Sequence, residues 1–382
     1  KEGSLIDVID ETKTPGGGRL LRDFLKNPLL EVKEIKKRHE AVSLLGLNLD
    51  ILNNLVSNLK GLPDLERTLT RINAKTNNPR DLILLQNFLK KSRIIFSELE
   101  NYRQSSIKKM IPEKKIREVG ESICKQIERK IYDSPPANLN EGGVIKEGVN
   151  NKLDELRNLK NEKKKIIISL QSNYAQITSI PNLKIKFNNF HGYFIEVTNK
   201  NKEKIQECDK LHFQLVQNTI NVSRFQSQEL KNLTQEIMSS ESASIELEQQ
   251  IYKELCSDLT KMNSFLNVYS KKISFLDVMC NFSIISKTRN YVRPDLVVGE
   301  PIIDIKNGRH PVVEKSLQNT GMMFTPNDCK LNNKISTWLM TGPNMAGKST
   351  FLRQTAVIVL LNQIGCFVPA DYARLSVFDK IF

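Results

Sequence analysis

Helical spacing of hydrophobic residues dominates the first third of the chain. Apolar side chains recur three and four positions apart within Leu20–Leu25 and again within Leu82–Leu89, which predicts helices over residues 1–135. Gly16-Gly17-Gly18 is expected to interrupt these helices. Pro79 is expected in the first turn of a new helix, because the residue before a proline is driven out of the helical region.

A turn-forming cluster follows the helical region. Ser134-Pro-Pro-Ala-Asn138 and Glu141-Gly-Gly143 combine proline with glycine, which predicts a loop and a first domain boundary. Beyond it, apolar residues from Val149 to Leu159 repeat at helical spacing among charged residues. We therefore expect an exposed amphipathic helix that continues to about Ala175.

The hydrophobic period then changes from helical to alternating. Apolar and polar residues alternate over Leu183–Asn188 and over Tyr193–Val197, with Phe190-His-Gly192 between them, which is typical of a β-hairpin. Alternation resumes from Leu211 through Phe213 and Leu215 to Val222. Together these stretches predict a small sheet over residues 182–224.

A long stretch without helix breakers comes next. Neither glycine nor proline occurs from Glu229 to Asn290, and apolar residues between Leu247 and Leu266 step by three or four positions. This pattern predicts one or two long helices, and a single straight helix would reach about 90 Å. Since helices flank the sheet on both sides in sequence, we expect an antiparallel pair of arms with the sheet at their tip. The alternative is a compact helical bundle with the sheet packed on its side.

Composition narrows the class of protein only in part. The 382 residues are too many for one ordinary core, so about two to four domains are expected. The net charge of +14 permits attraction to nucleic acid, although lysine-rich stretches such as Lys163–Lys165 equally fit solvated helix surfaces. No apolar run approaches the length of a membrane helix. Six cysteines without a CxxC pair indicate reduced thiols, and a start at Lys1 without a leader suggests an excised fragment.

The clearest chemical motif lies near the end of the chain. Pro294 and Pro301 mark a further boundary, after which Ile335–Thr341 is expected to form a strand and Phe351–Ile364 a helix. Between them stands Gly342-x-x-x-x-Gly347-Lys348-Ser349, the phosphate-loop pattern in its strand–loop–helix context.

The residue types of this loop match what a triphosphate requires. Glycines let backbone N–H groups approach phosphate oxygens, and the positive end of the following helix adds to the field. Lys348 is expected to reach the β- and γ-phosphates, while the Ser349 hydroxyl is expected to coordinate Mg²⁺. Hydrolysis also needs a second acidic group and a residue that positions water. Neither can be assigned in the residues after Ser349, and the four histidines are too far apart in sequence to indicate another catalytic site.

Longer segments carry a resemblance to a known family. Thr341-Gly-Pro-Asn-Met-Ala-Gly-Lys-Ser-Thr-Phe-Leu-Arg-Gln354 resembles the nucleotide loop of the MutS family of DNA mismatch-repair proteins, although Ala346 stands where many relatives have glycine. Thr14-Pro-Gly-Gly-Gly-Arg19 departs from the family's usual turn sequence. Further segments that resemble the family, in family order, are Asn78-Pro-Arg-Asp-Leu82, His191-Gly-Tyr-Phe-Ile-Glu-Val197, Gly308-Arg-His-Pro-Val-Val-Glu314 and Phe324-Thr-Pro-Asn-Asp328.

The resemblance implies a multidomain α+β fold that is mostly helical. Residues 1–135 would form a helical core, 136–181 an outgoing lever helix, and 182–228 a DNA-contacting β clamp. Residues 229–293 would form the returning lever helix and more of the core. Residues 294–382 would be the amino-terminal part of a P-loop ATPase domain of the ABC class, and we expect the chain to end before the catalytic half of that domain.

Site residues follow from the same resemblance. Phe324 would lie against the adenine of ATP with Asn327 nearby, Lys348 would act in catalysis and Ser349 would hold Mg²⁺. In the clamp, a basic turn and a family motif would contact DNA phosphates, whereas Tyr193 and Phe194 are expected in the clamp core. The alternative for the lysines is an ordinary solvated turn. The remaining phosphate-loop positions are Gly342, Pro343, Asn344, Met345, Ala346, Gly347 and Thr350, and the clamp positions are Lys200, Lys202, Lys204, Asn221 and Arg224.

The function that the resemblance implies is ATP-dependent recognition of mismatched double-stranded DNA. Full-length relatives form homodimers around the duplex, convert into an ATP-driven sliding clamp and recruit a MutL-type protein, here in a bacterial cytoplasm or nucleoid with no membrane involved. The fragment is expected to lack efficient hydrolysis. One alternative is a paralogue that acts on branched recombination DNA, and another is a non-catalytic DNA-binding piece.

Overall fold

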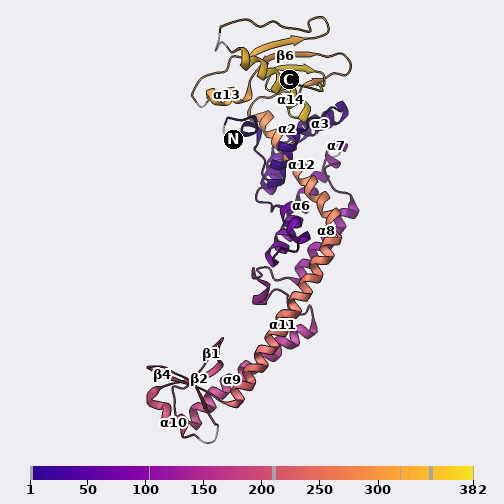
Figure 1. The fold of residues 1–382 in the computed structure, drawn as a ribbon. Helices are drawn as coiled ribbons and strands as arrows, with labels where there is room; N and C mark the ends of the chain where they lie inside the picture. Colours follow the sequence, from indigo (N-terminus) through magenta and orange to yellow (C-terminus); the bar gives the residue numbers. More distant parts are fainter. Residues whose placement is uncertain (1–2, 103, 209–211, 319, 344–346, 382) are drawn as a thin grey trace. The chain divides into compact units, whose positions relative to one another are not determined.

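The computed structural model describes residues 3–102, 104–208, 212–318, 320–343 and 347–381. The chain divides into two compact units, coloured by sequence in Figure 1. Unit 1 comprises residues 1–77, 81–125 and 259–382, and unit 2 comprises residues 78–80 and 126–258. Most of the described residues are helical, and none of their helices combines the length and apolar character that a bilayer crossing requires.

Helices make up the amino-terminal part of unit 1, as the apolar spacing predicts. Pro79 occupies the first position of α6, which confirms the helix start expected there. The side chain of Asp81, in the first turn of α6, binds the Arg71 guanidinium through Nε at 3.1 Å. The bounds are α1 Leu5–Ile9, α2 Pro15–Lys26, α3 Val32–Leu47, α4 Leu49–Leu59, α5 Leu65–Asn73, α6 Pro79–Glu100, α7 Ser105–Lys108, α8 Lys114–Lys130 and α12 Asn263–Thr288. The first two residues of α6 and the last five of α8 belong to unit 2.

The glycine triplet Gly16–Gly18 lies inside helix α2, so the expected interruption is wrong. Thr14 caps the helix by accepting a hydrogen bond from the Gly17 backbone N–H at 2.9 Å, and Pro15 takes the first position, where its missing N–H costs nothing. A Cβ on Gly17 would overlap the carboxylate of Asp277 in α12. The glycines therefore serve close helix packing rather than a turn.

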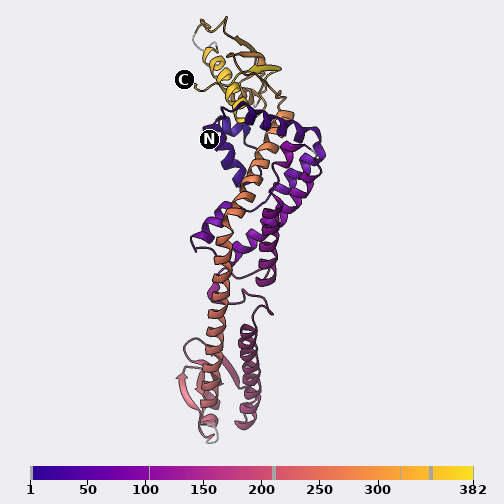
Figure 2. The same ribbon diagram turned by 90° about the vertical axis from the view of Figure 1, so that its right-hand side faces the viewer.

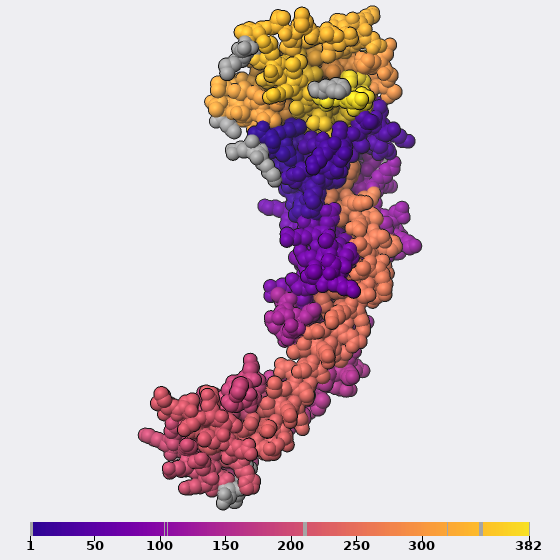
Figure 3. Space-filling view, in the orientation of Figure 1, coloured from indigo at the N-terminus to yellow at the C-terminus, as the bar shows by residue number. Residues whose placement is uncertain are grey.

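A mixed sheet and two helices form the carboxyl-terminal part of unit 1. The strands are β5 Asp295–Leu296, β6 Ile303–Gly308, β7 Asn327–Leu331 and β8 Tyr372–Leu375, in the order β5-β8-β6-β7. β5 is parallel to β8, and β6 is antiparallel to both neighbours. Helix α13 spans Pro311–Gln318, and helix α14 spans Lys348–Ile364 and packs against α2 and α3. Figure 3 shows this yellow and orange region directly against the indigo helices of the same unit.

The strand expected at Ile335–Thr341 is absent. After β7, the Asn332 side chain accepts hydrogen bonds from the backbone N–H groups of Lys334 and Ile335, which closes a turn. Residues 336–341 are not paired with any described strand. Extended chain becomes a strand only by pairing with a neighbour, so the apolar composition of this segment is not sufficient.

Unit 2 contains an antiparallel helix pair, shown side by side in Figure 2. Helix α9 spans Asn151–Ile177, close to the limits that the apolar spacing predicts, and α11 spans Gln228–Lys261, continuing past unit 2 at its end. Ion pairs join Arg157 to Glu248, Lys160 to Glu241 and Lys163 to Glu236. Rising numbers on α9 match falling numbers on α11, which confirms the antiparallel pair. Because α11 ends before Met262 and α12 begins after it, the long breaker-free stretch forms two helices.

Four short strands form a sheet at the end of this helix pair. They are β1 Lys184–Asn188, β2 Gly192–Thr198, β3 Gln214–Asn218 and β4 Val222–Gln226, all antiparallel, in the order β1-β2-β4-β3. Ile167, Leu170 and Tyr174 of α9 share one buried cluster with Ile195 of β2 and Phe225 of β4. The predicted sheet and its place at the tip of the pair are thus confirmed, while Leu211 lies outside the described residues.

The segment between α8 and α9 is irregular, as its prolines and glycines predict, apart from a short 3-10 helix at Leu139–Glu141. Glu248 of α11 fixes it. The Glu248 side chain is 2% exposed, and its carboxylate accepts hydrogen bonds from the backbone N–H groups of Gly143 at 3.1 Å and Val144 at 2.7 Å. Arg157 adds a charged hydrogen bond to the same carboxylate at 2.7 Å. This buried carboxylate therefore ties the loop to both helices of the antiparallel pair.

Candidate functional site

The phosphate-loop sequence leads directly into the amino terminus of α14. Gly347 is the residue before the helix and has φ +85°, a conformation that favours glycine. The Lys348 ammonium donates a hydrogen bond to the Gly342 carbonyl, so the side chain folds back over the start of the loop. Ser349 is exposed in the first turn. Asn344, Met345 and Ala346 lie outside the described residues.

The start of α14 has the electrostatics of an anion site. The first backbone N–H groups of a helix have no partner within the helix, and the aligned peptide dipoles place partial positive charge there. No acidic residue occupies the first turn of α14. The described residues of the loop could therefore hold an anionic group, with the Lys348 ammonium as the nearby cation and the exposed Ser349 hydroxyl beside it.

A polar pair links α14 to the strand region behind the loop. The Asn327 amide donates hydrogen bonds to the Thr325 carbonyl at 3.0 Å and to the Gln354 side chain at 3.3 Å. Gln354 is fully buried, and its own Nε2 atom has no hydrogen-bond partner among the described residues. Phe324 is half-buried three residues before Asn327. The structure thus connects Asn327 to α14, and it connects Phe324 only through the chain.

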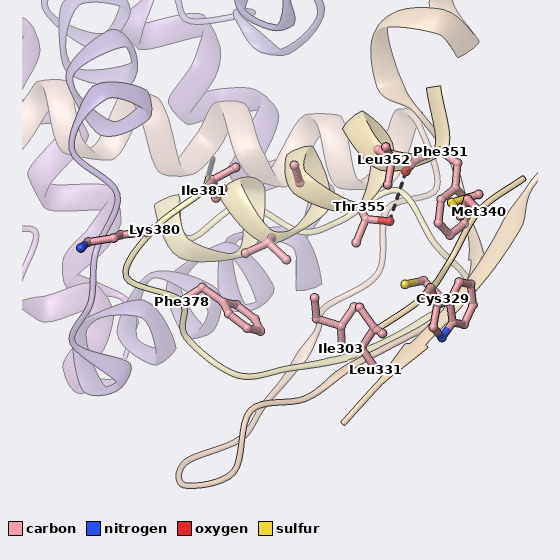
Figure 4. Close-up of a pocket in the computed structure, with 13 residues that line it drawn as sticks. Ile303, Cys329, Leu331, Met340, Phe351, Leu352, Thr355, Phe378, Lys380 and Ile381 are labelled. Carbon is pink, nitrogen blue, oxygen red and sulfur yellow. Dashed lines mark hydrogen bonds between the residues drawn. The ribbon is translucent and has the colours of Figure 1, made fainter. Parts of the chain in front are cut away.

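The cavity beside α14 is apolar and distinct in chemistry from a phosphate cradle. It has a volume of about 300 Å³, and Lys380 is the one charged side chain that lines it in the described chain. Figure 4 shows Phe351 and Thr355 of α14 on one side, with Cys329 and Leu331 of β7 on the other. The Trp338 ring stacks on Phe351 with centroids 5.9 Å apart and 9° between planes. This contact holds the unpaired segment before the loop against α14.

The far end of α14 is anchored to the turn between α2 and α3. Leu29 N donates to the Gln363 carbonyl at 3.1 Å, and the Gln363 amide donates back to the Leu29 carbonyl at 3.1 Å. Arg38 of α3 donates to the Ile364 carbonyl at 2.7 Å while its guanidinium lies 3.5 Å from the centroid of the Phe24 ring. Burial lowers the pKa of Arg38 to about 10. A cation at a helix carboxyl terminus is stabilising, so this contact favours the observed docking of α14.

Two turns come together at one edge of the four-stranded sheet in unit 2. The Asn199 amide donates hydrogen bonds to the carbonyls of Thr219 at 2.9 Å and Ile220 at 2.8 Å. Its backbone N–H donates to the Asn221 carbonyl at 3.2 Å. Lys200, which follows Asn199, and Asn221 are both exposed, so Asn199 brings these two predicted site residues together.

The other basic residues predicted to contact DNA differ in whether their side chains are already bound within the protein. Lys202 and Lys204 lie on the short helix α10, Lys202–Gln206, where Lys204 is exposed and Lys202 is half-buried. Arg224 of β4 instead binds Glu196 at 3.1 Å and Gln217 at 2.7 Å, and its guanidinium lies 4.8 Å from the centroid of the Phe194 ring. Arg224 is therefore committed to contacts within the sheet. Phe194 is buried at 2% exposure, as predicted, but it lies outside the buried cluster on which the half-buried Tyr193 packs.

Comparison with known proteins assigns a family to this arrangement. The family model described as MutS domain III matches residues 1–283, which cover most of both units, and the model described as MutS domain V matches residues 338–382. The chain belongs to the MutS family.

Individual MutS relatives match the whole chain. Proteins named "DNA mismatch repair protein MutS" from Rickettsia bellii (strain RML369-C) and Lactobacillus gasseri are each 38% identical to it over 100% of its length. The aligned region is 43% of the Rickettsia bellii protein and 44% of the Lactobacillus gasseri protein. The chain thus spans less than half the length of these MutS proteins.

The sequence alone does not predict the roles of three residues that are important to the fold of this MutS-family chain. Asn199 joins the two turns, Glu248 fixes the loop before α9, and Gln363 anchors the end of α14. Each acts through partners distant in sequence, so local patterns do not reveal which contacts it makes. Glu248 and Gln363 do carry a weak signal, because each is a polar residue at an interior position of an otherwise apolar helix spacing.

Proposed function

We propose that this chain is the portion of a MutS-type mismatch-repair protein that carries a DNA-contacting clamp, a helical core and the first part of an ATPase domain. In this proposal residues 1–135 and 229–293 supply core and returning lever, 136–181 the outgoing lever, 182–228 the clamp, and 294–382 the nucleotide-binding part. The family membership and the observed order of helix pair, sheet and phosphate-loop helix support it.

The nucleotide in this proposal is ATP with Mg²⁺, held at the start of α14. The observation that carries it is the phosphate-loop sequence immediately before a helix whose first turn is free of acidic residues. Lys348 would exchange its hydrogen bond with the Gly342 carbonyl for one with a β- or γ-phosphate, and Ser349 would face the metal. Phe324 and Asn327 would bind near the adenine. When bound, the metal neutralises charge on the phosphates.

The remaining loop positions have a supporting part. Backbone N–H groups of residues 342–350 would surround the phosphates, because a glycine-containing loop lets the main chain approach a ligand closely. For the 382-residue chain alone we propose binding of ATP with turnover near background, since no residue after Ser349 can be assigned as a second acidic metal ligand or as the group that positions water.

In this proposal the DNA contacts come from the two turns that Asn199 joins and from the short helix α10 that follows the first of them. Lys200, Lys202 and Lys204 would bind backbone phosphates, with Asn221 adjacent. Arg224 would support the sheet and reach DNA only by leaving Glu196. Contacts of this kind position a protein on a duplex without reading its sequence, which suits a protein that must act at any mismatch.

For the whole protein we propose mismatch recognition on double-stranded DNA, coupled through ATP to a sliding-clamp state in a homodimer that recruits a MutL-type partner. The printed names of the relatives support mismatch repair over a branched-DNA role. No membrane is involved in this proposal.

The nucleotide part is tested by Lys348→Ala. In the gene product that contains this chain, the variant should lose ATP-driven release from mismatched duplex, and in the isolated chain it should lose binding of a fluorescent ATP analogue. Lys334→Ala removes the same charge from the exposed turn after β7 and is the matched control. Release and analogue binding that are the same in both variants would overturn the nucleotide proposal.

The DNA part is tested by exchanging three lysines for glutamine. Replacing Lys200, Lys202 and Lys204 should weaken duplex binding and reduce the slope of log affinity against log salt by about 1 for each lost phosphate contact. The matched triple of Lys152, Lys164 and Lys165, all exposed on α9, changes net charge equally. If both triples weaken binding alike, the surface around Lys200, Lys202 and Lys204 is not the DNA-contacting surface, and duplex binding depends only on overall charge.

A further inference from the structure

A second cavity in unit 1 lies away from both proposed sites. It has a volume of about 310 Å³ and is bordered by α3, by α12, by the turn between α2 and α3, and by α7 with the residues that follow it. Four apolar side chains line it, of which Ala41 and Met110 are buried and Leu29 and Phe275 are half-buried. The size is at the lower end for small-molecule sites, which are about 300–1,000 Å³.

Positive charge is concentrated around this cavity. Lys37, Arg38, Lys109 and Lys272 line it together with a single carboxylate, Glu34, which is already paired with Lys37. Among the described residues, Lys109 and Lys272 form no ion pair within 4.0 Å, although Glu34 attracts Lys109 and Glu113 attracts Lys272 at longer range. The Lys272 ammonium instead donates to the Lys109 backbone carbonyl, and burial lowers the pKa of Lys272. Four basic side chains thus line the cavity with one carboxylate, so an anion bound there would reduce the repulsion among them.

One buried hydroxyl in the cavity lacks a partner. Ser106 is 8% exposed, and its Oγ atom makes no hydrogen bond to any residue that the structure describes. A buried polar atom without a partner costs about 1–3 kcal/mol, and such atoms are rare in native proteins. Because Ser106 lines the same cavity as Lys109 and Lys272, the oxygens of an anionic group bound there would give the hydroxyl an acceptor and the two ammonium groups a counter-charge.

From this geometry we infer that the cavity binds a small organic anion. Its phosphate or carboxylate group is held by Lys109, Lys272 and the Ser106 hydroxyl, and its apolar body packs on Met110 and Phe275. Arg38 adds charge while remaining bound to the end of α14. The site is independent of the ATP and DNA proposals, since none of its residues belongs to either.

The test uses phenyl phosphate as the probe, titrated into the 382-residue chain and followed by calorimetry. The titration is performed on the Lys348→Ala background, because the phosphate loop would otherwise bind the probe as well. We expect saturable binding that is at least about tenfold tighter than for inorganic phosphate or benzyl alcohol, since charge and apolar body each contribute. Benzoate in place of phenyl phosphate determines whether a carboxylate serves as well as a phosphate.

Three variants assign the binding to this cavity. Lys272→Met keeps the packing of the side-chain stem and should weaken binding by about tenfold, whereas Lys271→Met, on the exposed side of α12, should change it less than twofold. Ser106→Ala removes only an unpartnered hydroxyl, so it should fold normally and weaken binding severalfold. The inference would be overturned if the probe showed no saturable binding. It would also be overturned if the Lys272→Met and Lys271→Met variants bound the probe equally and Ser106→Ala bound it as tightly as the chain that retains Ser106 does.

Discussion

Two helix pairs in this chain are held together by opposite physical means. In unit 1, α2 and α12 approach so closely that a Cβ on Gly17 would lie 2.7 Å from the Asp277 Cγ atom. Asp277 is 1% exposed, and its carboxylate accepts hydrogen bonds from Thr14 N at 2.8 Å and Thr14 Oγ1 at 2.7 Å. In unit 2, α9 and α11 share an apolar cluster next to the sheet, and beyond it they are joined by ion pairs such as Lys160–Glu241, whose Glu241 side chain is 46% exposed.

The difference predicts how each pair responds to change. A close-packed contact depends on shape and is sensitive to the addition of a single carbon, but salt barely affects it. Exposed ion pairs tolerate substitution and weaken as salt screens them. Shape thus fixes the α2–α12 contact, whereas ion pairs fix the register of α9 against α11, and all but the one at the buried Glu248 are partly exposed.

The largest effect is expected at the buried Glu248. Glu248→Ala would leave Arg157 without its partner and the Gly143 and Val144 N–H groups without their acceptor, which should destabilise unit 2 by about 4 kcal/mol. Hydrogen exchange at residues 143–145 measures it, with faster exchange expected there. Glu246→Ala, exposed on the same helix, should leave exchange unchanged. Protected amides in the Glu248 variant would mean that the loop is held by its own chain.

Gly17→Ala is expected to have the next largest effect. The added Cβ overlaps the Asp277 carboxylate, which its hydrogen bonds hold in place, so about 3 kcal/mol of stability should be lost. Gly18→Ala, one residue further along α2, meets only the ends of the Arg22, Thr12 and Asp10 side chains, none closer than 3.2 Å, and should cost less than about 1 kcal/mol. Trp338, the single tryptophan, reports unfolding of unit 1 by its fluorescence. Equal midpoints for the two variants would contradict the shape argument.

Acid should destabilise unit 1 through His39 of α3. Burial lowers the pKa of His39 to about 4, below its unfolded value of about 6.5. Between these pKa values the unfolded chain binds the proton and the folded chain does not, so stability falls by about 1.4 kcal/mol per unit as pH drops from about 6.5 to 4. Burial raises the pKa of Asp277, which acts in the opposite direction.

The contribution of His39 is therefore measured as a difference between two proteins. Urea unfolding, followed by Trp338 fluorescence at several pH values, should give a shallower pH dependence for His39→Gln than for the unaltered chain. His212→Gln, which changes an exposed histidine of unit 2, should leave the pH dependence of unit 1 as it was. Parallel pH profiles for the two variants would exclude His39 as the source.

The smallest expected effect is that of the Lys160–Glu241 pair. A double-mutant cycle with Lys160→Gln and Glu241→Gln should give a coupling of about 0.5 kcal/mol at low salt that disappears near 1 M salt. The same salt change should leave the stability difference between Gly17→Ala and the unaltered chain constant. A coupling that persists at high salt would show that the pair is less exposed to solvent than the 46% exposure of Glu241 indicates.

How far the sequence predicts this structure depends on the range of the interactions. The helices, the small sheet and the phosphate-loop helix follow from apolar spacing and turn residues, which are local. Whether Gly16–Gly18 form a turn or part of a helix depends instead on α12, about 260 residues later. Whether residues 335–341 form a strand depends on a pairing partner that the described strands do not supply. Cross-strand pairing of Glu196 with Arg224 likewise requires the register of β2 and β4. For this reason Arg224 resembles a free cation in sequence but not in structure.

The anchoring of Gln363 and Ile364 gives α14 the mechanics of a hinged rod. With its carboxyl end fixed to the α2–α3 turn, the 17-residue helix is about 25 Å long, and a displacement at Lys348 cannot be absorbed by sliding. It must appear as rotation about the fixed end, and a movement of about 1 Å at the loop corresponds to a swing of only about 2° for a rod of that length. A displacement of the phosphate loop would therefore reach α2 and α3 as a small rotation of α14 at its contact with these helices.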